Sequence, residues 1–263
     1  MGLTNVSFYN AQRSMMTAQQ GINTATQRLS TGNRINSAKD DAAGLAISER
    51  MNAQTKGMAV AVRNANDAIS LSQTAEGALS NVSDSLQRMR ELAVQARNAT
   101  NNDSDKDSLD AEFGQLAQEV QRVLGGTQIN GKAIVGADAG AQVFQIGAGT
   151  GTSDTISITT TNLTTDADLT KVAGTDLAGT GRSKIDNTAD STAIGTVISD
   201  LDTALSKVNS QRATFGATQN RFDAVIKSLS SSMESQSAAR DRIVGADYAT
   251  ESANLAKYQI LQQ

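Results

Sequence analysis

The chain has 263 residues and a formal net charge of −4, and it contains no Pro, Cys, Trp or His. The lack of Cys and His excludes disulfides, thiolate nucleophiles, the commonest general base and the usual zinc ligands. The acidic balance argues against nucleic acid as a partner, and no apolar run approaches the roughly 18 residues that suggest a membrane span. Residues 1–20 also lack the basic start and apolar stretch of a secretory signal.

The first part of the chain, residues 1–128, is rich in Ala, Gln and Leu and has helical periodicity. The polar stretch "NATNNDSDKD" (98–107) predicts a turn, and its Asp residues favour another helix from Asp107 to Val123. We interpret the apolar stripes of these helices as core packing. The main stripe comprises Ala61, Ala65, Ala68, Leu71, Ala75, Ala78, Val82, Leu86, Met89, Ala93 and Ala96.

The middle of the chain shifts to Gly, Thr, Asp and Ser and holds the strand signals. The segments "AQVFQIG" (141–147) and "DTISITT" (154–160) alternate apolar and polar residues on either side of a glycine-rich loop, which predicts a hairpin. The loop glycines lack the spacing of a nucleotide-binding loop, and no helix pattern follows them. Residues 161–190 contain little apolar material and predict a surface-exposed connector.

Residues 191–263 are helical again and carry the most regular pattern of the chain. Apolar residues recur at a/d spacing, with Arg212 and Gln219 as the polar members of the seam. The predicted fold class is therefore mainly α, an elongated antiparallel helical bundle or coiled coil with a small β-hairpin region. The apolar seam comprises Ile194, Ile198, Leu201, Leu205, Val208, Phe215, Phe222, Ile226, Leu229 and Met233.

A charged junction, "RLSTGNRINSAKDDAAGLAIS", separates two helical segments near the N-terminus. Its Asp40 and Asp41 come nearest to a paired-carboxylate site, but neighbouring helix positions point roughly 100° apart and do not face one substrate. We interpret Ser37 as a helix cap with both carboxylates in the first turns, where Arg34 and Lys39 balance them within the molecule or in a neighbour. No catalytic, cofactor-binding or metal-binding residues are predicted, and an enzyme is not expected.

Several blocks of the sequence together resemble one known family. These blocks are long and keep one order along the chain, and they closely resemble those of bacterial flagellin, the subunit of the flagellar filament. The initial "MGLTNVSFYNAQRSMM" is a looser match. The blocks are "QRLSTGNRINSAKDDAAGLAISERM" (27–51), "LQRMRELAVQARNATN" (86–101), "TQINGKAIVG" (127–136), "VFQIG" (143–147), "QNRFDAVIKSL" (219–229) and "ARDRIVGADYATESANLAKYQILQQ" (239–263).

The resemblance implies a domain organisation. Flagellins insert outer domains in the middle of the chain, and here the resemblance implies a short form with little or no outer domain. It also implies that the chain stops before the hydrophobic C-terminal helix of the family, which includes the binding site of the export chaperone. The expected domains are an inner-tube helix and spoke start (1–38), rod-domain helices and hairpin (39–160), a short variable connector (161–190), the long rod-domain helix (191–245) and the start of a second inner-tube helix (246–263).

The function implied by the resemblance is that of a structural subunit that polymerises into the extracellular flagellar filament. The implied partners are other copies of the chain, the flagellar cap and junction proteins, the export chaperone and, in hosts, Toll-like receptor 5. Export would use the flagellar secretion apparatus without a cleaved signal peptide. Neither a cofactor, nor nucleic acid, nor a membrane is an expected partner. The junction residues expected to contact neighbouring subunits are Arg34, Asn36, Lys39, Asp40 and Asp41.

The receptor-contacting block of the family also has a match in this chain. On one helix, Arg88 and Leu92 are spaced to share a face, which would place a planar cation beside an apolar side chain. The residues that match the block, "LQRMREL", are Gln87, Arg88, Arg90, Glu91 and Leu92, and Glu112 in "LDAEFGQL" matches a further receptor-contacting position.

Three alternatives compete with a filament subunit. A hook–filament junction protein shares the terminal helices but would match "AKDDAAGLAIS" less well. Another non-enzymatic coiled-coil assembly protein would explain the heptads but not the ordered blocks. A flagellin with a metalloprotease insert would need His residues and a longer insert than this chain has.

Overall fold

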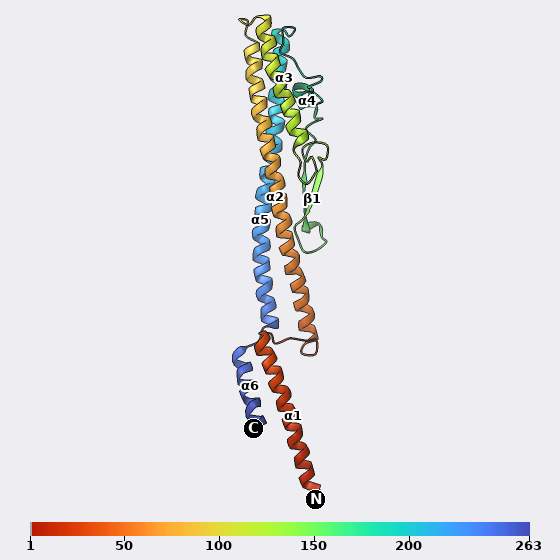
Figure 1. Cartoon of the computed structure of the whole chain (residues 1–263), viewed down its shortest axis with the longest axis vertical. Coiled ribbons are helices and arrows are strands. Elements are labelled where there is room, and N and C mark those ends of the chain that lie inside the picture. Colours follow the sequence, from red (N-terminus) through yellow and green to blue (C-terminus); the bar gives the residue numbers. More distant parts are fainter. Residues whose placement is uncertain (1) are drawn as a thin grey trace. The chain divides into compact units, whose positions relative to one another are not determined.

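The computed structural model describes residues 2–263, with side chains described from Val6 onward. The chain is mainly helical with a small two-stranded antiparallel sheet, which confirms the mainly α class with a hairpin (Figure 1). Without proline, and with many good helix formers, the sequence can sustain long uninterrupted helices. Two compact units are present: a terminal unit (Met1–Ala59 with Leu229–Gln263) and a central unit (Val60–Ser228).

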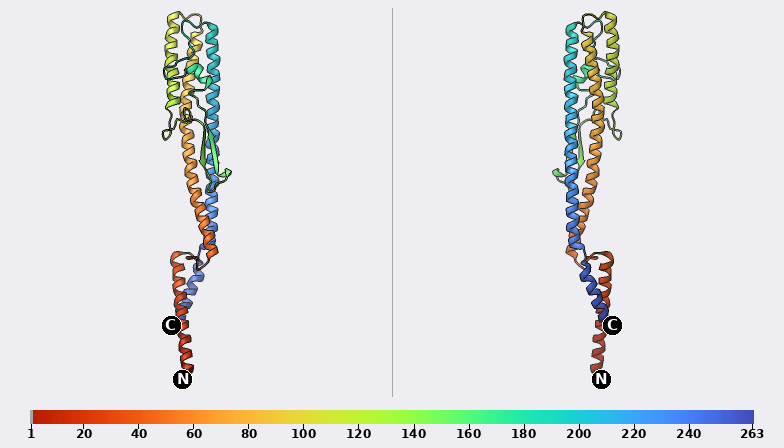
Figure 2. Two further views of the ribbon diagram at one scale, coloured as in Figure 1. Left: turned by 90° about the vertical axis from the view of Figure 1, so that its right-hand side faces the viewer. Right: turned by 90° about the vertical axis from the view of Figure 1, so that its left-hand side faces the viewer.

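The terminal unit contains the two helices at the chain ends. Helices α1 (Gly2–Thr31) and α6 (Tyr248–Gln262) pack against each other and run antiparallel (Figures 1 and 2). Asp247 starts α6, because its side chain accepts hydrogen bonds from the backbone N–H groups of Ala249 and Thr250. This pairing brings the two ends of the sequence together in one unit.

The central unit is organised by the antiparallel pair of α2 (Ala42–Ala96) and α5 (Ser191–Val244) (Figure 2). Within this unit Arg90 of α2 pairs with Asp202 of α5 at 2.7 Å. The predicted seams form the core, because their apolar residues are buried along both helices. The fully buried members on α5 include Ile194, Leu201, Val208, Phe215 and Phe222.

Helix α3 (Asp103–Gly126) packs in the same core through residues such as Phe113. It starts earlier than the predicted Asp107, because Asn102 and Asp105 form a reciprocal capping box at its N-terminus. The polar turn predicted before it is therefore shorter than expected.

The hairpin joins β1 (Ala141–Gln145) to β2 (Thr155–Thr159), with Ala141 opposite Thr159 and Gln145 opposite Thr155. Ile156 and Ile158 point into the core, whereas Val143 is exposed. The alternation read from the sequence therefore sets the buried face of β2, whereas on β1 the apolar Val143 lies on the exposed face. In Figure 2 the hairpin lies against α2 and α5.

The prediction that residues 161–190 form a surface-exposed connector is wrong. The segment contains α4 (Ala167–Ala173), which packs on α3. Its few apolar side chains are buried in the central core, so the segment is anchored there despite its low apolar content. The buried ones are Leu163, Leu169, Val172, Ala173 and Ile185.

Candidate functional site

The charged junction between α1 and α2 lies in the terminal unit. Asp41 caps α2, since its Oδ1 accepts a hydrogen bond from the backbone N–H of Gly44 at 2.8 Å. The prediction that Ser37 caps this helix, with both carboxylates in its first turns, is wrong because α2 begins at Ala42, after Asp40 and Asp41. The two carboxylates instead shape the turn that leads into the helix.

Asp40 holds the preceding turn closed. Its Oδ2 accepts hydrogen bonds from the backbone N–H groups of Asn36 (3.1 Å) and Ser37 (2.9 Å) and from the Ser37 hydroxyl (3.0 Å). These bonds, led by that of the Ser37 hydroxyl, lower the pKa of the Asp40 carboxyl below its ordinary value. Asn36 also donates its side-chain amide to the Asn33 carbonyl at 2.8 Å. The Lys39 side chain is exposed and forms no ion pair within residues 2–263.

Arg34 ties the junction to the end of α5. Its backbone N–H donates to the Val244 carbonyl at 2.6 Å, and its Nη2 donates to the Ile243 carbonyl at 2.8 Å. An antiparallel bridge pairs Asn33 with Gly245 beside these bonds. The guanidinium therefore satisfies the Ile243 carbonyl at a helix C-terminus, where a cation is favourable, and does not balance the carboxylates.

The contacts between α1 and α6 include an ion pair, a close ring contact and a hydrogen bond from Gln262 Nε2 to Gln19 Oε1 at 2.6 Å. Arg28 Nη1 and Glu251 Oε1 lie 2.8 Å apart, and both side chains are largely buried. An added Cβ at Gly21 would lie 2.7 Å from the Tyr258 ring, so only glycine lets this ring lie flat against α1. These contacts fix the register of the two helices.

Both terminal helices nevertheless expose large apolar side chains. Single exposed apolar residues are ordinary, but a run of them along paired helices is typical of a surface that another molecule covers. On α1 they are Val6, Phe8, Tyr9, Met15 and Met16, and on α6 they are Tyr248, Ile260 and Leu261.

The seam of α5 includes three residues with contacts that the sequence did not predict. Phe222 meets Phe144 of the hairpin edge-to-face, with ring centroids 5.8 Å apart. The polar seam members Arg212 and Gln219 both approach Glu76 of α2, at 3.9 Å and 3.2 Å. Among the remaining predicted seam residues, Leu205, Ile226 and Leu229 are only half-buried.

The residues that match the receptor block lie on α2 and α3 in the central unit. Arg88 contacts two carboxylates, Glu112 of α3 at 2.8 Å and Glu91 at 3.0 Å, and all three side chains are substantially exposed. The hydrogen bond to Glu112, followed by that to Glu91, raises the pKa of the Arg88 guanidinium. The structure thus brings three of the predicted residues into one charged cluster.

The prediction that Leu92 lies beside Arg88 as an apolar partner is wrong. Leu92 is fully buried in the core, so it offers no apolar surface beside Arg88. The exposed apolar side chain of this stretch is Val94. Gln87 is exposed, and Arg90 is engaged with Asp202.

A buried ion pair that the sequence did not predict holds the segment after α4. Arg182 Nη2 lies 2.6 Å from Asp110 Oδ2 of α3, and the backbone N–H of Ile185 donates to Asp110 Oδ1 at 2.9 Å. The guanidinium lies over the Phe113 ring, 5.6 Å from its centroid. An added Cβ at Gly114 would lie 2.9 Å from Arg182 Nη2, so this glycine makes room for the arginine.

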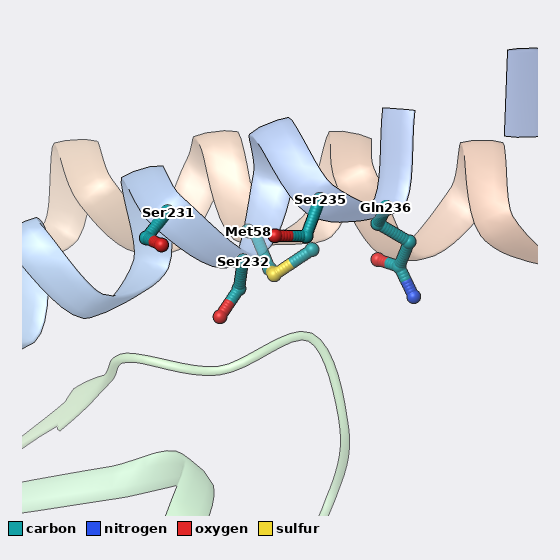
Figure 3. Close-up of a pocket in the computed structure, with 5 residues that line it drawn as sticks. All are labelled: Met58, Ser231, Ser232, Ser235 and Gln236. Atoms are coloured by element: carbon teal, nitrogen blue, oxygen red, sulfur yellow. The ribbon is translucent and has the colours of Figure 1, made fainter. Parts of the chain in front are cut away.

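A shallow hollow of about 420 Å³ lies between α2 and α5 in the terminal unit (Figure 3). Its lining is uncharged, and no group of His, Cys, Asp or Glu able to hold a metal ion occurs within the described residues. Likewise, no helix in residues 2–263 is long and apolar enough to cross a membrane. The lining residues are Met58, Ser231, Ser232, Ser235 and Gln236.

These features define a class of protein, a helical structural subunit whose terminal helices present apolar side chains for association. Residues 3–138 match the bacterial flagellin N-terminal helical region, and residues 198–263 match the bacterial flagellin C-terminal helical region. The chain is 40% identical to a flagellin of Halalkalibacterium halodurans over 98% of this chain and 90% of that protein. It is 33% identical to flagellin A of Vibrio cholerae over 99% of this chain and 93% of that protein.

The chain belongs to the bacterial flagellin family. It is a structural subunit of the flagellar filament, which lies outside the cell. A crystal structure of Bacillus cereus flagellin matches with a TM-score of 0.51 and 34% identity, over 64% of this chain and 88% of that one. A putative flagellar hook-associated protein of Vibrio parahaemolyticus matches with a TM-score of 0.64 but only 14% identity, over 78% of this chain and all of that one, which shows a shared fold.

Proposed function

We propose that the α1–α6 pair is the part of the subunit that other copies cover in the filament. The observation that carries this proposal is the run of exposed apolar side chains on both helices. The domain boundaries expected for inner tube, spoke, rod and connector remain proposals that rest on family membership. So do subunit contacts by Arg34, Asn36, Lys39, Asp40 and Asp41, of which Lys39 is the most available because its charge is unpaired within residues 2–263.

The assembly proposal predicts a loss of polymerisation when the aromatic pair on α1 is made polar. Phe8 and Tyr9 form an exposed edge-to-face pair, with ring centroids 6.2 Å apart. Phe8→Ser combined with Tyr9→Ser should raise the concentration needed for filament growth about tenfold or more, since burying each ring contributes about 1.5–3 kcal/mol. Electron microscopy and sedimentation of the full chain measure this.

A matched control distinguishes a specific effect on assembly from the general effect of removing an exposed apolar side chain. Leu177 is as exposed as Phe8 but lies in the central unit, so Leu177→Ser should assemble like the parent. Helix content of both variants should be unchanged by circular dichroism. Normal filaments from the doubly substituted chain would overturn the proposal.

Export and the remaining partners are also proposed. We infer that the chain leaves the cell through the flagellar secretion apparatus without a cleaved signal peptide, and that it meets the cap and junction proteins at the filament ends. The support for this is membership of the flagellin family. Deleting the secretion apparatus should leave the chain inside the cell.

We further propose that the cluster of Arg88, Glu91 and Glu112 is recognised by Toll-like receptor 5. Arg88→Ala should weaken receptor activation by the monomer about tenfold or more, because a buried interface arginine is typically worth about 2 kcal/mol. A receptor reporter assay measures this. Because the pairs that Arg88 makes within the chain are exposed, helix content and stability should change little.

The control for the receptor prediction is another exposed, paired arginine. Arg122 on α3 pairs with Glu119 and lies outside the matched block, so Arg122→Ala should keep full potency. Equal potency of the parent and Arg88→Ala would remove Arg88 from the recognition site.

A further inference from the structure

One tight turn in the central unit has a composition found nowhere else in the chain. Asn130 and Gly131 form the only Asn-Gly pair of the sequence. Both residues have positive φ, 50° and 77°, as in a two-residue hairpin turn of the type that Asn-Gly favours. Ile129 and Lys132 flank the turn and exchange backbone hydrogen bonds of 2.9 and 3.0 Å.

The turn is open to solvent. Asn130, Gly131 and Lys132 are all exposed, and apart from its chain neighbours no residue has a heavy atom within 4 Å of the position that a Gly131 Cβ would take. Within residues 2–263 neither the Gly131 N–H nor the Asn130 side chain has a hydrogen-bond partner. The backbone nitrogen that follows Asn130 is therefore free and unhindered.

We infer that Asn130 is a site of spontaneous deamidation in the folded protein. The Gly131 nitrogen attacks Asn130 Cγ and forms a C–N bond, while the Cγ–Nδ2 bond breaks and ammonia leaves. Water then opens the cyclic imide at either carbonyl and yields aspartate or isoaspartate, so the only co-reactant is water. Ring closure requires Asn130 to leave its left-handed conformation, which the two hydrogen bonds between Ile129 and Lys132 oppose.

Two other asparagines, Asn36 and Asn209, precede a serine, and the fold protects both of them. The Ser37 N–H that follows Asn36 donates to Asp40 Oδ2 at 2.9 Å. Asn209 and Ser210 lie inside α5, where backbone N–H groups are bonded along the helix. The backbone nitrogens of Ser37 and Ser210 must lose their hydrogen bonds before they can attack. Folding therefore slows deamidation at Asn36 and Asn209 but not at Asn130.

The products would alter the turn. Either product places a new negative charge in the turn, close to Lys132 in sequence. Isoaspartate also adds a methylene to the backbone, which shifts Ile129 and Lys132 out of register. Ile129 packs against the central core, and the buried residues 133–136 follow directly, so the change would loosen an attachment of the core.

The test compares the same three sites in the folded chain and in urea. After incubation at mildly alkaline pH, trypsin releases peptides 123–132, 35–39 and 208–212, which each carry one of the three asparagines. Mass spectrometry and isoaspartate detection then give a rate for each site. Folding should slow Asn36 and Asn209 at least about tenfold, but Asn130 by only a few-fold.

Comparing the folded and urea-treated rates at one site cancels the effect of the following residue on the intrinsic deamidation rate. Asn130→Gln, which would need a larger ring, should abolish the mass gain in peptide 123–132 and leave the other two peptides unchanged. The inference is overturned if the folded chain gains no isoaspartate at Asn130, or if folding protects Asn130 as strongly as Asn36 and Asn209.

Discussion

Replacing Phe222 with alanine is expected to lower the free energy of unfolding by about 3–5 kcal/mol, because a fully buried ring leaves a cavity in a seam that relaxes only partly. The ring fills the α5 side of the core and meets Phe144 edge-to-face. The loss therefore combines burial on the helix seam with a contact that holds the hairpin. Urea unfolding followed by circular dichroism measures it.

The hairpin offers a matched pair of controls for this prediction. Phe144→Ala removes the partner ring, and a double-mutant cycle with Phe222→Ala should show a coupling of about 0.5–1.5 kcal/mol. Val143→Ala changes the neighbouring residue, which points away from the core and is 65% exposed, so it should have almost no effect. A small loss for Phe222→Ala would contradict the heptad assignment of α5.

The long helices and the hairpin were predictable because their signals are local and repeated. The a/d spacing that includes Phe215 and Phe222 predicted buried positions on α5, and both residues are fully buried. Alternation around Ile156 and Ile158 likewise predicted the buried face of the hairpin. In each case several residues indicate the same buried face, so a single polar neighbour does not change the prediction.

The junction and the connector were predicted less well because their structure depends on distant partners. Ser37 and Asp41 are both good caps, and tertiary bonds such as that from Arg34 to the Val244 carbonyl select between them. Leu92 was misread as an exposed partner of Arg88 because spacing alone does not say which face of a crowded helix is covered. The receptor and subunit roles remain proposals, since they depend on molecules outside this chain.

In the connector, the buried long-range ion pair of Arg182 and Asp110 yields the second large expected effect. Asp110→Ala should cost about 3–5 kcal/mol, because it leaves the buried Arg182 guanidinium without its carboxylate and the Ile185 N–H without its acceptor.

We expect the loss of stability in Asp110→Ala to come from the burial of the ion pair and not from its geometry. Arg122→Ala tests the distinction, because the Glu119–Arg122 pair has equally short bonds of 2.6 and 2.7 Å but is exposed, so its loss should cost less than about 1 kcal/mol. Urea unfolding compares the two variants, and hydrogen exchange should show faster exchange at Ile185 only in Asp110→Ala. If both substitutions cost the same, the Arg182–Asp110 pair does not hold the connector on α3.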